Sequence, residues 1–196
     1  MVDSVYMNET AQQILDVAQD LVRCRGYSAF SYADISKQVG IRKASIHYHF
    51  PSKEALVKDL VTRYRTHFQR QLTILEQSDA DPQTQLQQFV GLYRAGLSDC
   101  QMCLCGILSA EIQILPDTVK QEVREFLAMV QTWLQAVLTT GERQGCLQLR
   151  LSPETEAALL LATVQGAQLL ARTEEDSIAA FGRLAQPLLA TLCIDR

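Results

Sequence analysis

The chain has 196 residues, a net formal charge of −4 and 47% hydrophobic residues, enough for one domain or two small ones with an apolar core. An overall negative charge argues against a nucleic-acid partner, but the charges are unevenly distributed. Residues 23–70 hold ten Lys or Arg against three acids, whereas residues 76–196 hold eight against fifteen. A basic end on an acidic chain favours contact with a polyanion at that end.

Neither a membrane span nor a secreted disulfide framework is expected. No apolar stretch reaches the length that crosses a bilayer, and the first ten residues lack the basic and apolar regions of a signal peptide. The six Cys residues are irregularly spaced. We therefore expect a cytoplasmic protein with no membrane partner, in a compartment that keeps thiols reduced.

The first predicted motif is a helix-turn-helix at about residues 31–50. Ser31, followed by Asp34 three residues later, predicts a capped helix start, and Gly40 predicts the end of that helix. A second short helix then runs until Pro51, because proline blocks a helix. Two short helices joined by a tight glycine turn form this motif.

Longer helices flank the motif on both sides. One is predicted over about 9–24, after a frayed start at 1–8, and the other from Ser52 to about Leu75. The second of these would join a basic head to the rest of the chain.

The second motif helix has the composition of a groove-binding helix. Only Ile46 and Phe50 are clearly apolar, and the other side offers small, basic and aromatic groups, which fits the major groove of DNA. Four residues are expected at or near base edges: Arg42, Ala44, Ser45 and His47. Four more are expected to contact phosphates: Lys43, Tyr48, His49 and Lys53.

This segment resembles the DNA-binding domain of the TetR/AcrR family of bacterial transcriptional regulators. The resemblance covers the first third of the chain and is carried by these residues: Gly26-Tyr27, Asp34-Ile35, Val39-Gly40-Ile41, Lys43-Ala44-Ser45-Ile46, Tyr48-His49-Phe50 and Ser52-Lys53-Glu54-Ala55-Leu56. The family implies an all-α fold of about nine helices, with a three-helix head at 8–68 and a ligand-binding and dimerisation body at 69–196. It also implies a homodimer on a palindromic operator in double-stranded DNA, a small-molecule effector and no cofactor.

The body is expected to consist of further helices separated at proline-containing breaks. The predicted spans are about 83–98, 107–115, 118–140, 153–172 and 177–192, with a loop or frayed helix end at 141–145 and a kink caused by Pro187. The last two helices are apolar on several faces. They are either the centre of a monomeric core or a four-helix contact between two copies, with Leu161 and Leu188 in that contact.

A ligand cavity is predicted among the body helices. Its candidate lining residues are Phe89, Tyr93, Met102, Cys103, Met129, Trp133 and Gln165. Apolar walls with a few amide groups suit an apolar or aromatic small molecule, and the alternative for most of these residues is ordinary core packing.

Cys100, Cys103 and Cys105 leave two interpretations open. They are small buried hydrophobes, or Cys103 senses oxidants or electrophiles, as a similar stretch does in some members of the family. No metal site is expected, because Cys103 and Cys105 would point almost oppositely on a helix and no His lies nearby in sequence.

No catalytic motif is present in the sequence. A Gly-rich phosphate loop, GxSxG and HExxH are all missing, and a thiol oxidoreductase using Cys100 and Cys103 would lack its strand-then-helix context. We therefore predict a DNA-binding transcriptional regulator, a repressor released by a small molecule. The alternatives are a thiol-sensing regulator and, as a different class, a thiol oxidoreductase.

Overall fold

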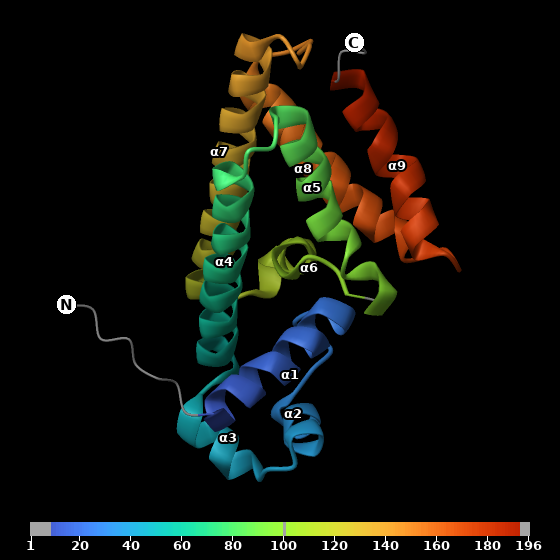
Figure 1. Ribbon diagram of the computed structural model, residues 1–196. Coiled ribbons are helices and arrows are strands. Elements are labelled where there is room, and N and C mark those ends of the chain that lie inside the picture. The colour runs from blue at the N-terminus through green and yellow to red at the C-terminus, as the bar shows by residue number, and fades with distance from the viewer. Residues whose placement is uncertain (1–8, 100, 193–196) are drawn as a thin grey trace, which may run out of the picture.

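The computed structural model describes residues 9–99 and 101–192, and within them the chain forms nine α-helices and two short 3-10 helices. The all-α prediction is confirmed. Cys100 and the predicted frayed segment 1–8 lie outside the described residues. Three helices make a head at one end of the molecule (Figure 1): α1 (Glu9–Arg25), α2 (Tyr32–Val39) and α3 (Lys43–His49).

The head forms where the local sequence signals predict it. The Asp34 carboxylate accepts hydrogen bonds from the Ser31 backbone N–H at 2.8 Å and from its hydroxyl at 2.7 Å, which fixes the start of α2. Gly40 ends that helix in the left-handed conformation, with a φ of 77°. Ile46 and Phe50 are buried against the other head helices, so the rest of α3 faces outward.

Helix α4 (Lys53–Gln77) connects the head to the body (Figure 1). The Ser52 hydroxyl caps its start by accepting from the Ala55 N–H at 3.1 Å. Its later turns pack along α7, with Phe68 and Leu72 buried. The same helix therefore contacts both parts of the molecule.

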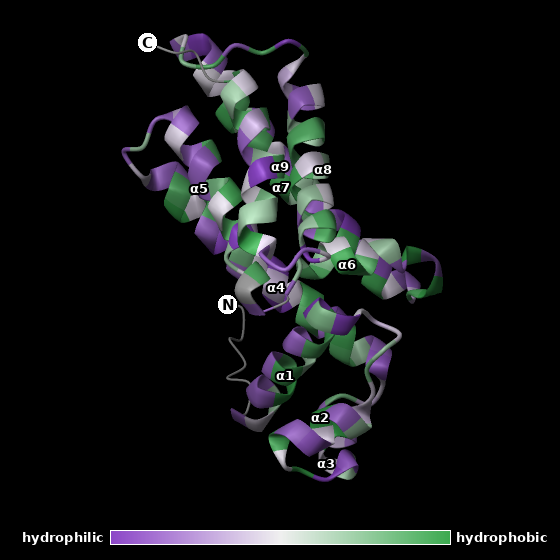
Figure 2. Cartoon of the chain, turned by 90° about the vertical axis from the view of Figure 1, so that its right-hand side faces the viewer, coloured by the Kyte–Doolittle hydropathy of each residue, from purple (hydrophilic) through white to green (hydrophobic). Residues whose placement is uncertain are grey.

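The body contains the remaining elements, and Figure 2 shows it at the end of the molecule away from α2 and α3. They are α5 (Pro82–Arg94), η1 (Leu97–Asp99), α6 (Leu104–Ala110), η2 (Ile112–Ile114), α7 (Asp117–Gln144), α8 (Pro153–Ala171) and α9 (Ser177–Leu192). Helix α6 lies between α1 and the body helices (Figure 1). No described helix has the length and apolar character needed to cross a membrane.

The prediction of a loop or frayed helix end at 141–145 was wrong, because α7 continues as a regular helix to Gln144. A Cβ on Gly141 would lie 2.3 Å from Leu147, so the glycine permits close packing and does not break the helix. Gly145, with a φ of 68°, ends it.

Two other helices differ from their predicted bounds. Helix α5 ends at Arg94 and not near residue 98, because the chain turns at Gly96, where a Cβ would lie 2.9 Å from the Gln101 carbonyl oxygen. Helix α6 begins three residues earlier than predicted and ends at Ala110, five residues earlier than predicted, with η2 following it. The Cys103 N–H that precedes α6 donates to the Gln168 side chain at 2.9 Å, which places this start against α8.

Candidate DNA-binding face and ligand-binding sites

Six of the eight residues predicted to contact DNA form one exposed surface. They are Arg42, Lys43, Ala44, Ser45, His47 and Tyr48. The Tyr48 side chain is 85% exposed, and such high exposure is unusual for a large aromatic residue. This surface on and beside α3, which we call the α3 face, can enter a major groove while Ile46 anchors the helix in the head.

The head holds His47 in place. The Tyr32 ring lies 4.7 Å from the His47 ring between centroids, and the Tyr32 hydroxyl donates to the Phe50 carbonyl at 2.9 Å. The pKa of Tyr32 is raised to about 12, chiefly by burial and to a lesser degree by Tyr27, so the hydroxyl keeps the proton it donates. A side chain ordered in this way can contact a base with little further loss of conformational freedom.

The other two predicted DNA contacts are less exposed. His49 is half-buried. The Lys53 ammonium donates to the Phe30 carbonyl at 2.6 Å and lies over the Tyr27 and Phe30 rings, and burial lowers its pKa. A phosphate contact by Lys53 requires its ammonium to leave these groups, so this contact stays a prediction.

Glu111, which follows α6, connects the body to the head. Its carboxylate accepts hydrogen bonds from the backbone N–H of Tyr27 and, at 3.1 Å, from that of Ser28, in the turn between α1 and α2. Burial raises the pKa of Glu111, but the hydrogen bonds from Ser28 and Tyr27 and the charge of Lys53 outweigh it, so the pKa lies below its usual range. Gly26 has a φ of 89°, and a Cβ there would lie 2.5 Å from the carboxylate.

A second connection lies at the end of α1. Arg23 and Met102 exchange two hydrogen bonds, from the Arg23 Nε to the Met102 carbonyl at 2.7 Å and from the Met102 N–H to the Arg23 carbonyl at 3.2 Å. Arg172, at the end of α8, donates to the Cys24 carbonyl at 2.9 Å. The last turn of α1 is therefore attached to the segment before α6 and to α8.

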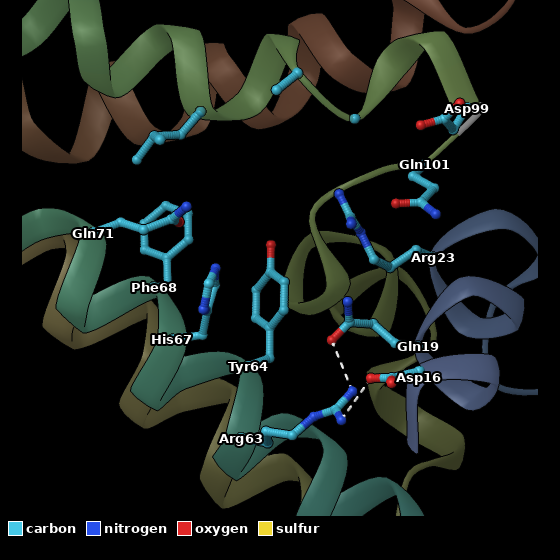
Figure 3. Close-up of a pocket in the computed structure, with 13 residues that line it drawn as sticks. Asp16, Gln19, Arg23, Arg63, Tyr64, His67, Phe68, Gln71, Asp99 and Gln101 are labelled. Atoms are coloured by element: carbon cyan, nitrogen blue, oxygen red, sulfur yellow. Dashed lines mark hydrogen bonds and ion pairs between the residues drawn. The ribbon is translucent and has the colours of Figure 1, made fainter. Parts of the chain in front are cut away.

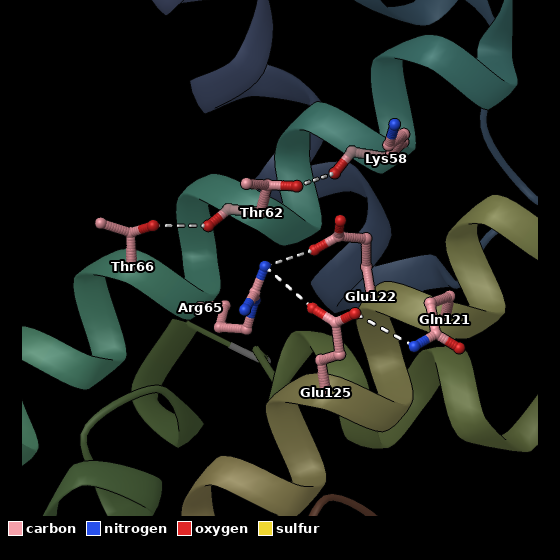
Figure 4. Close-up of polar contacts among 7 residues, drawn as sticks. All are labelled: Lys58, Thr62, Arg65, Thr66, Gln121, Glu122 and Glu125. Carbon is pink, nitrogen blue, oxygen red and sulfur yellow. Dashed lines mark hydrogen bonds and ion pairs between the residues drawn. The ribbon is translucent and has the colours of Figure 1, made fainter. Parts of the chain in front are cut away.

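Helix α4 is attached to α7 by an ionic cluster (Figure 4). The Arg65 guanidinium lies 3.0 Å from the Glu122 carboxylate and 3.1 Å from that of Glu125. Sequence reasoning missed this cluster and the Glu111 and Arg23 contacts, because each joins residues more than fifty positions apart.

The structure brings together three of the predicted ligand-binding residues. The Phe89 ring stacks on the Trp133 ring with centroids 5.6 Å apart, and its centroid lies 5.2 Å from that of Tyr93. Gln165 lies against α6, where its amide oxygen would be 2.1 Å from a Cβ on Gly106. Met129, one turn before Trp133, is half-buried.

Met102 and Cys103 lie at the edge of this group, near the head. The Met102 sulfur accepts from Arg172 at 3.0 Å. Cys103 is 2% exposed and lies near Tyr93, whose pKa is raised first by burial and then by the neighbouring thiol. Cys105 is fully buried, and burial raises its pKa, so its reactive thiolate form is disfavoured.

Four buried polar atoms of the predicted ligand-binding residues have no hydrogen-bond partner in the described part of the chain. They are the Tyr93 hydroxyl oxygen, the Trp133 Nε1 and both polar atoms of the Gln165 amide. Gln168, one turn further along α8, is different, because its amide donates to the Tyr93 carbonyl at 2.5 Å and accepts from the Cys103 N–H. Buried polar groups are ordinarily paired, so these four atoms indicate where a polar ligand group would be favoured.

A separate cleft of about 510 Å³ opens between α1, α4 and the segment around η1 (Figure 3). Arg23, Arg63 and His67 contribute basic groups, and Asp16 and Asp99 contribute acidic ones. None of the predicted ligand-binding residues lines this cleft. The Tyr93 ring packs behind it, 5.8 Å from the Phe68 ring between centroids.

An exposed helix-turn-helix on an all-helical body is the arrangement of a DNA-binding transcriptional regulator. Residues 14–60 match the family described as bacterial regulatory proteins, tetR family, and residues 82–185 match the tetracyclin repressor-like C-terminal domain. The chain belongs to the TetR family.

Individual members of the family are similar to this protein over most of the chain. The HTH-type transcriptional repressor DhaR of Mycobacterium sp. (strain GP1) is 29% identical over 169 residues, covering 84% of this chain and 83% of DhaR. A TetR-family regulator from Agrobacterium tumefaciens has a structure with a TM-score of 0.90 and 42% identity, covering 94% of this chain and 98% of its own. A TetR regulator from Legionella pneumophila has a TM-score of 0.86 and 28% identity, covering 95% of this chain and 99% of its own.

Proposed function

We propose that the protein is a homodimeric repressor that binds a palindromic operator through α3 and is released by a small molecule bound in the body. The exposed α3 face carries the first part of this proposal. Four residues would lie at or near base edges: Arg42, Ala44, Ser45 and His47. Four would contact phosphates: Lys43, Tyr48, His49 and Lys53. A protein that binds an operator in this way would act in the cytoplasm, where a bacterial chromosome lies.

Helices α8 and α9 supply the proposed dimer contact. Exposed apolar side chains recur along them, among them Leu159, Leu170 and Leu184, which are 46%, 58% and 42% exposed. Gly166 lies between the first two, and a Cβ there would meet nothing within 4 Å. A glycine inside a helix costs about 1 kcal/mol relative to alanine, so its presence in this stripe supports the close approach of a second helix.

Leu161, which the sequence placed in this contact, lies inside the protomer. Leu161 is 8% exposed in a single protomer, so its side chain belongs to the protomer core. A charge at that position would disrupt folding whether or not a dimer forms.

The unpaired atoms of Tyr93, Trp133 and Gln165 support an effector site between α5, α7 and α8. All three side chains are uncharged, and Phe89 adds an aromatic surface. The site therefore suits a neutral aromatic or apolar molecule that carries both a hydrogen-bond donor and an acceptor. Cys103, if it senses oxidants, would first have to become accessible, because its side chain is buried.

The test is selection of DNA by the purified full-length protein from a random duplex library. The proposal predicts enrichment of an inverted repeat whose half-sites are one helical turn, about 34–36 Å, or a multiple of it apart. Effector binding is then screened by the fluorescence of Trp133, the only Trp in the chain. A library that shows no enriched sequence contradicts the proposal, as does an effector that leaves operator affinity unchanged.

A further inference from the structure

The cleft between head and body holds an arginine and an aspartate that are not paired with each other. Arg63 and Asp16 form an ion pair at 2.7 Å, which leaves the charges of Arg23 and Asp99 and the imidazole of His67. Among the described residues, neither Arg23 nor Asp99 makes an ion pair. Figure 3 shows Arg23 and Asp99 on the same side of the cleft, with Gln101 beside them.

The donors of Arg23 are held in a fixed position. Its Nε is bound by the Met102 carbonyl at 2.7 Å, and its NH2 lies 2.6 Å from where a Cβ on Gly96 would be. The terminal nitrogens of Arg23 have no acceptor in the described part of the chain, although they line the cleft. A planar guanidinium held in this way can bind a carboxylate through two parallel hydrogen bonds.

Aromatic rings line the α4 side of the cleft. The Tyr64 and Phe68 rings are stacked with centroids 6.1 Å apart, and the Arg23 guanidinium lies 5.9 Å from the centre of the Tyr64 ring. His67 faces the same space from the next turn (Figure 3). The cleft therefore combines a flat apolar surface with one unneutralised charge of each sign.

We propose that this cleft binds a small zwitterion with an apolar or aromatic side group, as in a free aromatic amino acid. The carboxylate would bind Arg23, the ammonium group would bind Asp99, and the side group would cover Tyr64 and Phe68. A volume of about 510 Å³ is sufficient for such a molecule.

This site is distinct from the effector site proposed between α5, α7 and α8. Arg23 belongs to α1 in the head, whereas Asp99 belongs to η1 in the body. A molecule that binds both residues would attach the head to the body at the α1 joint. The site would thus give the protein a second small-molecule input that acts directly on the placement of the head.

The test is isothermal titration calorimetry of the full-length protein with three matched probes and no DNA. L-Phenylalanine carries both charges, 3-phenylpropanoate only the negative one and 2-phenylethylamine only the positive one. We expect L-phenylalanine to bind about tenfold more tightly than either, the effect of one good charged contact. Because DNA is absent, the result is independent of whether the operator proposal holds.

Two variants then assign the charges. Asp99→Asn should remove the preference of the protein for L-phenylalanine over 3-phenylpropanoate, and Arg23→Gln should remove its preference over 2-phenylethylamine. Asp79→Asn, at an exposed acid outside the cleft, is the matched control and should keep both preferences. Equal affinity for the three probes, no binding of L-phenylalanine at millimolar concentration, or preferences unchanged in the two cleft variants would overturn the proposal.

Discussion

The contact between Gly26 and Glu111 allows a quantitative test of how the body is attached to the head. Glu111→Ala removes the carboxylate that accepts from the N–H groups of Tyr27 and Ser28. Gly26→Ala adds a Cβ that would lie 2.5 Å from that carboxylate, at a residue with a φ of 89°. The two substitutions affect the same contact from opposite sides.

The expected costs follow from these contacts. Losing two partly exposed hydrogen bonds to a charged group should cost about 1–2 kcal/mol of unfolding free energy after water replaces them. Gly26→Ala should cost about 1–2 kcal/mol for the left-handed backbone, plus the displacement of Glu111. In the Glu111→Ala background this displacement disappears, so the double variant should be more stable than additivity predicts by roughly 1 kcal/mol.

Thermal unfolding followed by circular dichroism measures these costs, with all variants at one protein concentration. For a chain of this length, Glu111→Ala should lower Tm by about 2–8 °C. The amides of Tyr27 and Ser28 should also lose protection from hydrogen exchange. Glu174→Ala, at an exposed acid, is the control. Additive costs in the double variant, or a Tm of Glu111→Ala equal to that of the control, would refute the proposed attachment.

Three further predictions concern the dimer, acid stability and the ionic cluster. Gly166→Leu should weaken the dimer at least tenfold in analytical ultracentrifugation. Gly91→Leu is the control and should not weaken it, because a Cβ added at this helical glycine also meets nothing within 4 Å. Equal dimer affinities of the two variants would exclude α8 from the contact. The pKa of Glu111 is lowered in the folded state, so the stability that this carboxylate contributes is present above its ordinary pKa of about 4.3 and is lost as the pH falls. Glu111→Gln should therefore flatten the fall of Tm below pH 5. Curves of Tm against pH that run parallel for the variant and the unmodified protein would contradict this. Arg65→Met should lower the unfolding free energy by about 1–2 kcal/mol in chemical denaturation. Arg70→Met, at an exposed site, is the control. If Arg65→Met costs no more than this control, the cluster does not stabilise the fold.

The head could be predicted almost completely from the sequence, because its signals are local. Ser31 and Asp34 are three residues apart, Gly40 follows the helix they start, and Pro51 limits the next one. The helix boundaries in this region agree with the prediction because each depends on one or two neighbouring residues.

The head–body contacts could not be predicted, because they join distant residues. Glu111 is 84 positions from Tyr27, and Arg172 is 148 positions from Cys24. The burial of Leu161 was missed for a related reason. The periodicity of an apolar helix does not show which faces are covered within the protomer and which remain for a partner.

The central claim, that α3 reads an operator, is tested most directly by operator affinity as a function of salt and of base substitutions. Lys43→Ala should weaken binding to all sequences alike and reduce the salt slope by about one. His47→Ala should instead cost roughly 1–3 kcal/mol on the selected operator and relax the preference at one base position. The account is contradicted if both variants bind the selected operator with the affinity, salt slope and base preferences of the unmodified protein.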